Sequence, residues 1–179
     1  MHQLKWRNRV YRGVSEHGFA RQEEDVKTFD RILLATDFSE ASDGALEEAI
    51  RLAKESGAIL IVTHAFQVPP STTVSYVPAN VFQEYEGALR AAASDRLSGL
   101  LDRIRSQGVE ARLLLVEGFA DEEIVEAAAR EKADLVVIGT HGRQGVARFF
   151  LGSVAARVVA TCPCPVLTVR PSRESSSGR

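Results

Sequence analysis

A continuous apolar run that ends at a glycine constrains the fold of this chain more than any other feature. Residues 135–138 are Leu-Val-Val-Ile, which is typical of a strand buried on both faces of a parallel sheet. Gly139 and Gly142 follow this run, and Gly152 and Ser153 precede an apolar helical pattern. The stretch therefore predicts a strand, a glycine-bearing loop and a helix start. Free backbone N–H groups, close approach at glycine and the positive end of a helix dipole together predict an anion site, most often for phosphate.

Strand patterns and helix patterns alternate along the rest of the chain. The strands that we expect cover residues 32–35, 59–65, 111–116, 135–138 and 166–169. The helices between them begin after an N-cap at Ser39, near Val81, near Asp121 and near Val154, and the second is expected to end at Gln107. Strands separated by helices predict an α/β fold, in which a five-stranded parallel sheet is doubly wound with helices on both faces.

Composition limits the class of protein. A chain of 179 residues with 45% hydrophobic residues suits one domain with a sizeable core. We expect an N-terminal extension at residues 1–29, a nucleotide-binding domain at 30–171 and a flexible tail at 172–179.

The net charge of −2 argues against a general nucleic-acid binder. The sequence shows no signal peptide and no run of roughly 20 apolar residues, so we expect no membrane span and a cytoplasmic protein.

The glycine spacing resembles a known signature. Gly139-x2-Gly142-x9-Gly152-Ser153 is similar to the nucleotide-binding signature of the universal stress protein family. Residues 32–40 look like the opening strand and turn of that family, and residues 164–169 look like its closing strand. The resemblance covers about residues 30–170 and implies the strand order three-two-one-four-five. Ligands bind such sheets where the connection order reverses, here between the first strand, which leads to Asp37, and the fourth, which leads to Gly139.

The resemblance implies an adenine nucleotide site. The residues that it places there are Ala35, Thr36, Asp37, Ala65, Ile138, Gly139, His141, Gly142, Arg143, Gly152, Ser153 and Val154. Asp37 would bind ribose hydroxyls, or would cap the following helix. The glycines would offer amides to phosphate or serve ordinary turns, and Ser153 would add a hydroxyl or act as an N-cap. Arg143 and Arg148 would neutralise phosphate or remain solvated, and Ala35, Thr36, Ala65 and Ile138 would contact the nucleoside or simply pack in the core.

The function implied by the resemblance is an ATP-binding regulatory module of the stress response, with slow or no hydrolysis and an unknown protein partner. Mg²⁺ could arrive with the nucleotide, held by phosphate oxygens and water. The alternatives are an enzyme that hydrolyses the nucleotide or transfers its nucleotidyl group in the same crevice, and a structural protein with a vestigial pocket. No catalytic residue is assigned, because Ser153 lacks a nucleophile elbow that would support a triad with His141 and Asp37.

Three further expectations concern other segments. The apolar strand at Val166 to Val169 would lie at a sheet edge, and an unprotected edge tends to pair, which predicts a homodimer through this strand. The long loop from Gln67 to Asn80 is either a lid over the ligand or an idle surface excursion. Cys162 and Cys164 are expected to be small apolar side chains, with no disulfide between them because adjacent extended residues point to opposite faces, and no metal site because further ligands are lacking.

Overall fold

A computed structural model describes residues 29–68, 78–140 and 151–170 of the chain. These residues form one five-stranded sheet of order β3-β2-β1-β4-β5, in which all neighbouring strands are parallel. The strands are β1 (Arg31–Ala35), β2 (Ile59–Phe66), β3 (Ala111–Glu117), β4 (Leu135–Gly139) and β5 (Val166–Val169). The α/β fold and the strand order expected from the sequence are therefore confirmed.

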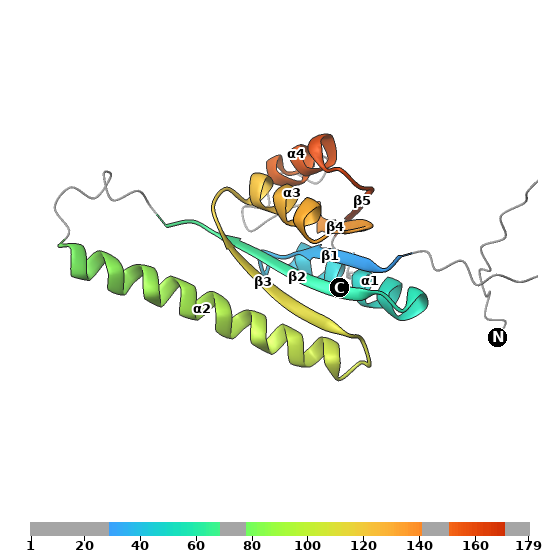
Figure 1. Ribbon diagram of the computed structural model, residues 1–179, viewed down its shortest axis with the longest axis horizontal. Helices are drawn as coiled ribbons and strands as arrows, with labels where there is room; N and C mark the ends of the chain where they lie inside the picture. Colours follow the sequence, from blue (N-terminus) through green and yellow to red (C-terminus); the bar gives the residue numbers. More distant parts are fainter. Residues whose placement is uncertain (1–28, 69–77, 141–150, 171–179) are drawn as a thin grey trace, which may run out of the picture.

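Helices cover both faces of the sheet (Figure 1). They are α1 (Glu40–Ser56), α2 (Ala79–Arg105), α3 (Ala120–Arg130) and α4 (Ser153–Thr161). One apolar layer joins Ile32 and Leu34 of β1 to α1 and α2, and the other joins Leu33 and Ala35 to α3 and α4. Residues 32–35 of β1 thus point alternately to opposite layers and are all buried, which explains their continuous apolar sequence.

Local sequence signals fix the ends of α1. The side chain of Ser39 accepts a hydrogen bond from the backbone N–H of Ser42, so the predicted N-cap is confirmed. Gly57 ends the helix with φ at 69°, a left-handed conformation that glycine adopts without steric strain. The boundaries expected for α2 were two residues late at each end, because this helix starts at Ala79 and ends at Arg105.

The helix α2 packs on the sheet through only part of its length. Ala93, Leu97 and Ile104 are buried, whereas Val81 and Tyr85 near its start are 46% and 49% exposed. In Figure 1 this green helix accordingly reaches well beyond the edge of the sheet. The loop expected at residues 67–80 and the extension expected at 1–29 fall mostly outside the described residues, and the tail expected at 172–179 lies wholly outside them.

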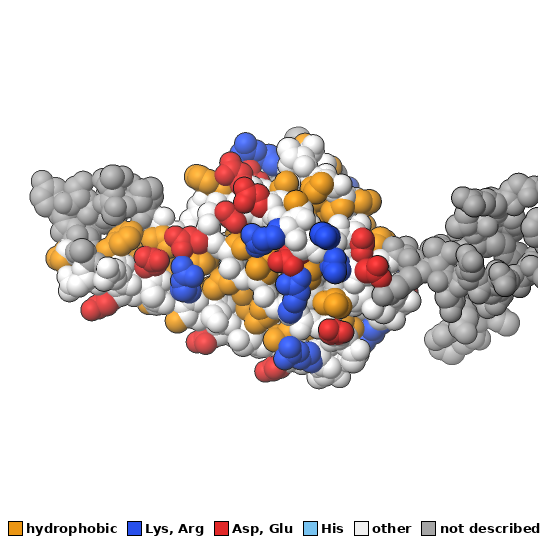
Figure 2. All heavy atoms as spheres, in the orientation of Figure 1, with side chains coloured by type: hydrophobic (Ala, Val, Ile, Leu, Met, Phe, Trp, Pro, Cys, Tyr) orange, Lys and Arg blue, Asp and Glu red, His pale blue; other side chains and the backbone are white. Residues whose placement is uncertain are grey.

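The surface carries charges of both signs. Figure 2 shows acidic and basic side chains interspersed across one face of the molecule. Several of them pair: Arg157 of α4 lies 2.9 Å from Asp121 of α3, and Arg90 of α2 lies 2.8 Å from Glu117 of β3. Exposed pairs of this kind contribute little stability each. Among the helices in the described part of the chain, none is long and apolar enough to span a bilayer.

The geometric reason for expecting no disulfide between the two cysteines is wrong. Cys162 and Cys164 are separated by one residue, and positions two apart in an extended chain point to the same side rather than to opposite sides. Their sulfur atoms lie 3.6 Å apart, and both cysteines are free.

Candidate functional site

The carboxyl ends of four neighbouring strands meet along one edge of the sheet. The backbone N–H of Thr36, just past β1, donates a hydrogen bond of 2.9 Å to the carbonyl oxygen of Thr63 in β2. On the other side, Ala35 of β1 lies opposite Ile138 of β4. The backbone N–H of Thr140, just past β4, donates a bond of 2.8 Å to the carbonyl oxygen of Val169 in β5. The ends of β1 and β4 are therefore adjacent, at the point where the strand order reverses.

The start of α4 lies at the same edge. The backbone N–H of Gly152 donates a hydrogen bond of 2.8 Å to the carbonyl oxygen of Thr140, so the chain returns to the end of β4 before α4 begins. Gly152 is the N-cap, since its carbonyl oxygen accepts the first helical bond, 2.9 Å from the N–H of Ala156. The alternative in which Ser153 is the N-cap is wrong. Ser153 is the first residue of the helix and is exposed.

Asp37 stands at the end of β1 in a network with two serines. Its Oδ1 accepts hydrogen bonds from the Ser39 hydroxyl at 2.6 Å, from the Ser39 backbone N–H at 3.1 Å and from the Ser42 hydroxyl. The Ser42 hydroxyl in turn accepts a bond of 3.1 Å from the backbone N–H of Asp37. The carboxylate therefore holds the first turn of α1 against the end of β1, while Ser39 rather than Asp37 is the N-cap of this helix and Asp37 remains only half-buried.

An unusual backbone conformation does not explain why positions 139 and 152 are glycine. Gly139 is the last residue of β4, and a Cβ added there would lie 2.8 Å from the backbone oxygen of Ala41 in α1. Tight packing of α1 against β4, rather than a turn, thus excludes a side chain at this position. Gly152 has φ of −58° and ψ of 153°, which most residues adopt, so a turn requirement does not explain its glycine either.

A second group of residues lies beside Asp37 on the α1 and α2 side of the sheet. The Phe38 ring stands 4.5 Å from the His64 ring, and the guanidinium of Arg96 in α2 lies 4.4 Å from the centre of the Phe38 ring. Nδ1 of His64 lies 2.7 Å from the carbonyl oxygen of Thr36, so this nitrogen carries the proton and donates it. Arg96, which follows Asp37 by 59 positions in the sequence, places a positive charge near the site. No local sequence signal identifies this arginine as a site residue.

A polar side-chain atom is buried beneath the edge of the sheet at which the carboxyl ends of the strands meet. Thr63 of β2 lies opposite Ala35, and its side chain shares the α3 and α4 face of the sheet with Ala35 and Ile138. Thr63 is 1% exposed, and its Oγ1 has no hydrogen-bond partner among the described residues. Buried hydroxyl groups of this kind are uncommon and destabilising.

The structure places most of the expected site residues along this edge, and the others fall outside the described residues. Ala35, Thr36, Asp37, Ala65, Ile138, Gly139, Gly152, Ser153 and Val154 follow the ends of β1, β2 and β4 and the start of α4. His141, Gly142, Arg143 and Arg148 lie outside the described residues. Sequence reasoning did not identify Ser42 or Arg96, because the role of each depends on contacts across the fold.

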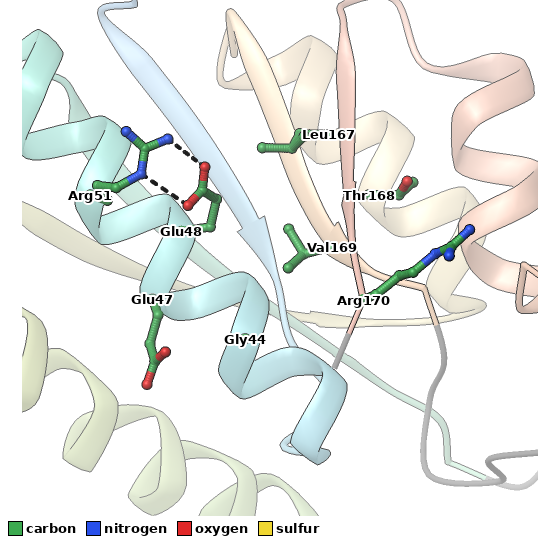
Figure 3. A pocket seen from close by; sticks show the side chains of 8 residues that line it. All are labelled: Gly44, Glu47, Glu48, Arg51, Leu167, Thr168, Val169 and Arg170. Atoms are coloured by element: carbon green, nitrogen blue, oxygen red, sulfur yellow. Dashed lines mark hydrogen bonds and ion pairs between the residues drawn. The ribbon is translucent and has the colours of Figure 1, made fainter. Parts of the chain in front are cut away.

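A separate cavity of about 550 Å³ lies between α1 and β5 (Figure 3). It is lined by Gly44, Glu47, Glu48, Arg51, Leu167, Thr168, Val169 and Arg170. Nε of Arg51 donates a hydrogen bond of 3.0 Å to Glu48, and this bond lowers the pKa of the Glu48 carboxyl group. Of the residues expected to bind nucleotide, none that the structure describes lines this cavity.

Comparisons with known proteins identify relatives over most of the chain. The family model described as "Universal stress protein family" matches residues 28–170. A universal stress protein of Thermus aquaticus is 38% identical over 143 residues, covering 79% of this chain and 99% of its own length. The solved structure of a Methanocaldococcus jannaschii protein of this kind has a TM-score of 0.71 and 26% identity, covering 81% of this chain and 98% of that one. A universal stress protein solved in complex with cAMP has a TM-score of 0.61 and 28% identity, covering 81% of this chain and 99% of that one.

Proposed function

The chain belongs to the universal stress protein family, and we propose that it is an ATP-binding regulatory module whose nucleotide lies at the carboxyl ends of β1 and β4. The observation that carries this proposal is the hydrogen bond from Gly152 to Thr140, since it brings the start of α4 to the ends of these strands. A helix start beside a switch point in a parallel sheet favours an anionic nucleotide. A relative solved with cAMP supports an adenine nucleotide as the ligand.

The phosphate groups are assigned to the start of α4. The backbone N–H of Ser153 lies at the positive end of the helix dipole, and the exposed Ser153 hydroxyl can donate a further hydrogen bond. Because Gly152 carries no side chain and has an ordinary φ, close approach of a ligand explains its identity better than a turn does. His141, Gly142 and Arg143 would complete this part of the site.

The nucleoside is assigned to the ends of β1 and β2. Asp37 would accept hydrogen bonds from the ribose hydroxyls, since a carboxylate is an acceptor and would repel phosphate. Ala35 and Thr36 would contact the nucleoside through their backbone groups, and Ala65 and Ile138 would pack against the adenine. Val154, which packs on the α3 and α4 layer, would lie beside the phosphates through its backbone.

Hydrolysis is expected to be slow or absent, because no residue in the described part of the site has a clear role in activating water. Asp37, the acidic residue of the site, accepts hydrogen bonds from Ser39 and Ser42 and so serves the helix start. Mg²⁺ would be held by phosphate oxygens and water. No group of three or more His, Cys, Asp or Glu side chains within the described ranges could hold a metal ion on its own.

Isothermal titration of ATP into the nucleotide-free full chain tests this proposal. The wild type should release or absorb heat with a stoichiometry near one, and Gly152→Val should lose most of this binding because its side chain would fill the phosphate position. Asp37→Asn is a subtler variant: its amide oxygen can still accept from Ser39 and Ser42, while its NH₂ group removes one acceptor. It should fold as the wild type does and bind ATP at least about tenfold more weakly. No heat and no thermal shift with the wild type at about 1 mM ATP would end the proposal.

We also propose that the chain forms a homodimer through β5. This strand is the last in the sheet order, so its outer edge has no strand partner among the described residues. Val136 donates to Pro165 and Thr140 donates to Val169, so the backbone of residues 165, 167 and 169 faces β4 and that of Thr168 faces outward. Thr168→Pro should therefore block the outer edge while β5 stays paired with β4. Light scattering should show a dimer for the wild type and a monomer for the variant, whereas a monomeric wild type at micromolar concentration would contradict the proposal.

A further inference from the structure

Two thiols lie side by side where α4 leads into β5. The Sγ atoms of Cys162 and Cys164 are 3.6 Å apart, and only Pro163 separates the two residues. Both cysteines are free and half-buried. Two sulfur atoms at this distance are in van der Waals contact, so little movement is needed to join them.

The backbone on both sides of the pair is fixed. The N–H of Cys162 donates a hydrogen bond of 2.9 Å to the carbonyl oxygen of Val158 in α4. After Cys164, the carbonyl oxygen of Pro165 accepts a bond of 3.0 Å from the N–H of Val136 in β4. Both cysteine side chains also pack against the apolar layer beneath α3 and α4. The two thiols are therefore held in contact by the fold.

We propose that Cys162 and Cys164 form a reversible redox site, which a low-molecular-weight disulfide of the glutathione class oxidises to an intramolecular disulfide. Three observations support the site: the sulfur contact, the partial exposure of both thiols and the anchoring of the backbone on either side. None of the residues assigned to the nucleotide takes part in it. The pair follows the C-terminal end of α4, about 13 Å along the helix from Ser153 at its start.

The two thiols have different roles in the exchange. Burial, followed by the contact with Cys162, raises the pKa of the Cys164 thiol to about 12. The negative charge of Asp134 acts in the same direction, and this carboxylate is fixed by hydrogen bonds of 2.8 and 2.9 Å from the N–H groups of Asp30 and Arg31. Cys164 therefore keeps its proton near neutral pH, and Cys162 is the thiol that attacks first.

The reaction takes two exchanges. The Cys162 thiol loses its proton to solvent, and its thiolate attacks one sulfur of the small disulfide; a mixed disulfide forms and one small thiolate leaves and is protonated. Cys164 then loses its proton and attacks the Cys162 sulfur, so that the bond between Cys162 and Cys164 forms and the second small thiol is released. The protein dithiol is oxidised and the small disulfide is reduced to two thiols. The ring closes over a single intervening residue, which restrains the unfolded chain little, so the bond serves reversible chemistry better than stability.

Intact mass spectrometry of the full chain tests this proposal. The reduced protein is incubated with oxidised glutathione, and the remaining thiols are then labelled with N-ethylmaleimide. We expect a monomer that is lighter by two hydrogens, that takes up no label and that returns to the dithiol with dithiothreitol. Two labelled thiols, or a stable adduct with one or two glutathiones, would overturn the proposal, and so would a disulfide found only between two chains.

Serine variants assign the order of attack and need no activity assay. Cys164→Ser should accumulate one glutathione on Cys162, because no second thiol can displace it. Cys162→Ser should react more slowly, since the remaining thiol is the one with the raised pKa. Equal rates for the two variants would contradict the assignment of Cys162 as the attacking thiol. The wild-type result stands without either variant, so a folding defect in one of them does not affect it.

Discussion

Replacement of Gly139 by alanine tests whether α1 and β4 pack as tightly as the structure shows. The added Cβ would lie 2.8 Å from the backbone oxygen of Ala41 and 2.9 Å from its backbone carbon. These are backbone atoms in the first turn of α1, so the helix start or the strand end must shift to admit a methyl group. Ala41 precedes Ser42, whose hydroxyl bonds to Asp37, and the shift should reach the candidate site as well.

The expected destabilisation is that of an overpacked core, about 1–3 kcal/mol in the free energy of unfolding. For a chain of this size that corresponds to a fall in Tm of about 2–12 °C. Urea denaturation followed by circular dichroism gives the free energy directly, and calorimetry gives Tm. The affinity for ATP should fall in the same variant, because the contacts between Asp37 and the first turn of α1 are disturbed.

Gly99→Ala is the matched control. Gly99 lies inside α2, and a Cβ added there would meet nothing within 4 Å. Alanine should therefore stabilise this helix by up to about 1 kcal/mol and leave ATP affinity unchanged. If Gly139→Ala were as stable as the wild type, or were stabilised like the control, the close packing of Ala41 against β4 would be refuted.

Three further substitutions test separate features of the fold. Thr63→Val removes a buried hydroxyl that has no hydrogen-bond partner among the described residues and should raise the free energy of unfolding by about 1 kcal/mol. Thr63→Ser keeps the hydroxyl and should not raise it. Equal stability of the two variants in urea denaturation would contradict this reasoning. Lys132→Gly should raise the free energy of unfolding by about 1 kcal/mol, because the exposed Lys132 has φ of 53° in the left-handed region, where glycine is not strained. An unchanged Tm would show that the backbone of Lys132 is not strained. Hydrogen bonding to Arg112 lowers the pKa of Glu131 below its ordinary value of 4.5, so this pair stabilises the fold fully above that pH and loses its effect as the pH falls through the lowered value. Glu131→Gln should therefore reduce the fall in the free energy of unfolding at acidic pH. If the free energy of the variant depended on pH as that of the wild type does, the pair would contribute nothing to stability.

The fold could be predicted from the sequence because its strands are continuously apolar and its helices have clear end signals. Residues 135–138 and 32–35 are buried on both faces, as their composition indicates, and Ser39 and Gly57 bound α1 as expected. The strand order came from the family resemblance rather than from periodicity. The start of α2 was misplaced because its first turns are exposed and carry a weak apolar pattern, and its end was misplaced because a turn at residues 106–108 follows the last helical residue.

The candidate site could be predicted only where adjacent residues carry the signal. Gly139 ends β4 and Asp37 lies two residues past β1, and the pairing of Ala35 with Ile138 places the ends of these two strands side by side as the sequence suggested. The reason why position 139 requires glycine could not be predicted, because it is the close approach of Ala41 in α1, which belongs to another element. The stacking of Arg96 on Phe38 also depends on tertiary packing between distant positions. The cysteine pair was misjudged because the alternation of an extended chain was applied to positions one residue apart rather than two.

A crystal structure of the full chain grown with ATP would test the central claim most directly. The account predicts phosphate oxygens at the backbone N–H and the hydroxyl group of Ser153, with the ribose hydroxyls within hydrogen-bond reach of Asp37. ATP bound instead in the cavity between α1 and β5, or with its phosphates directed away from the start of α4, would contradict the account.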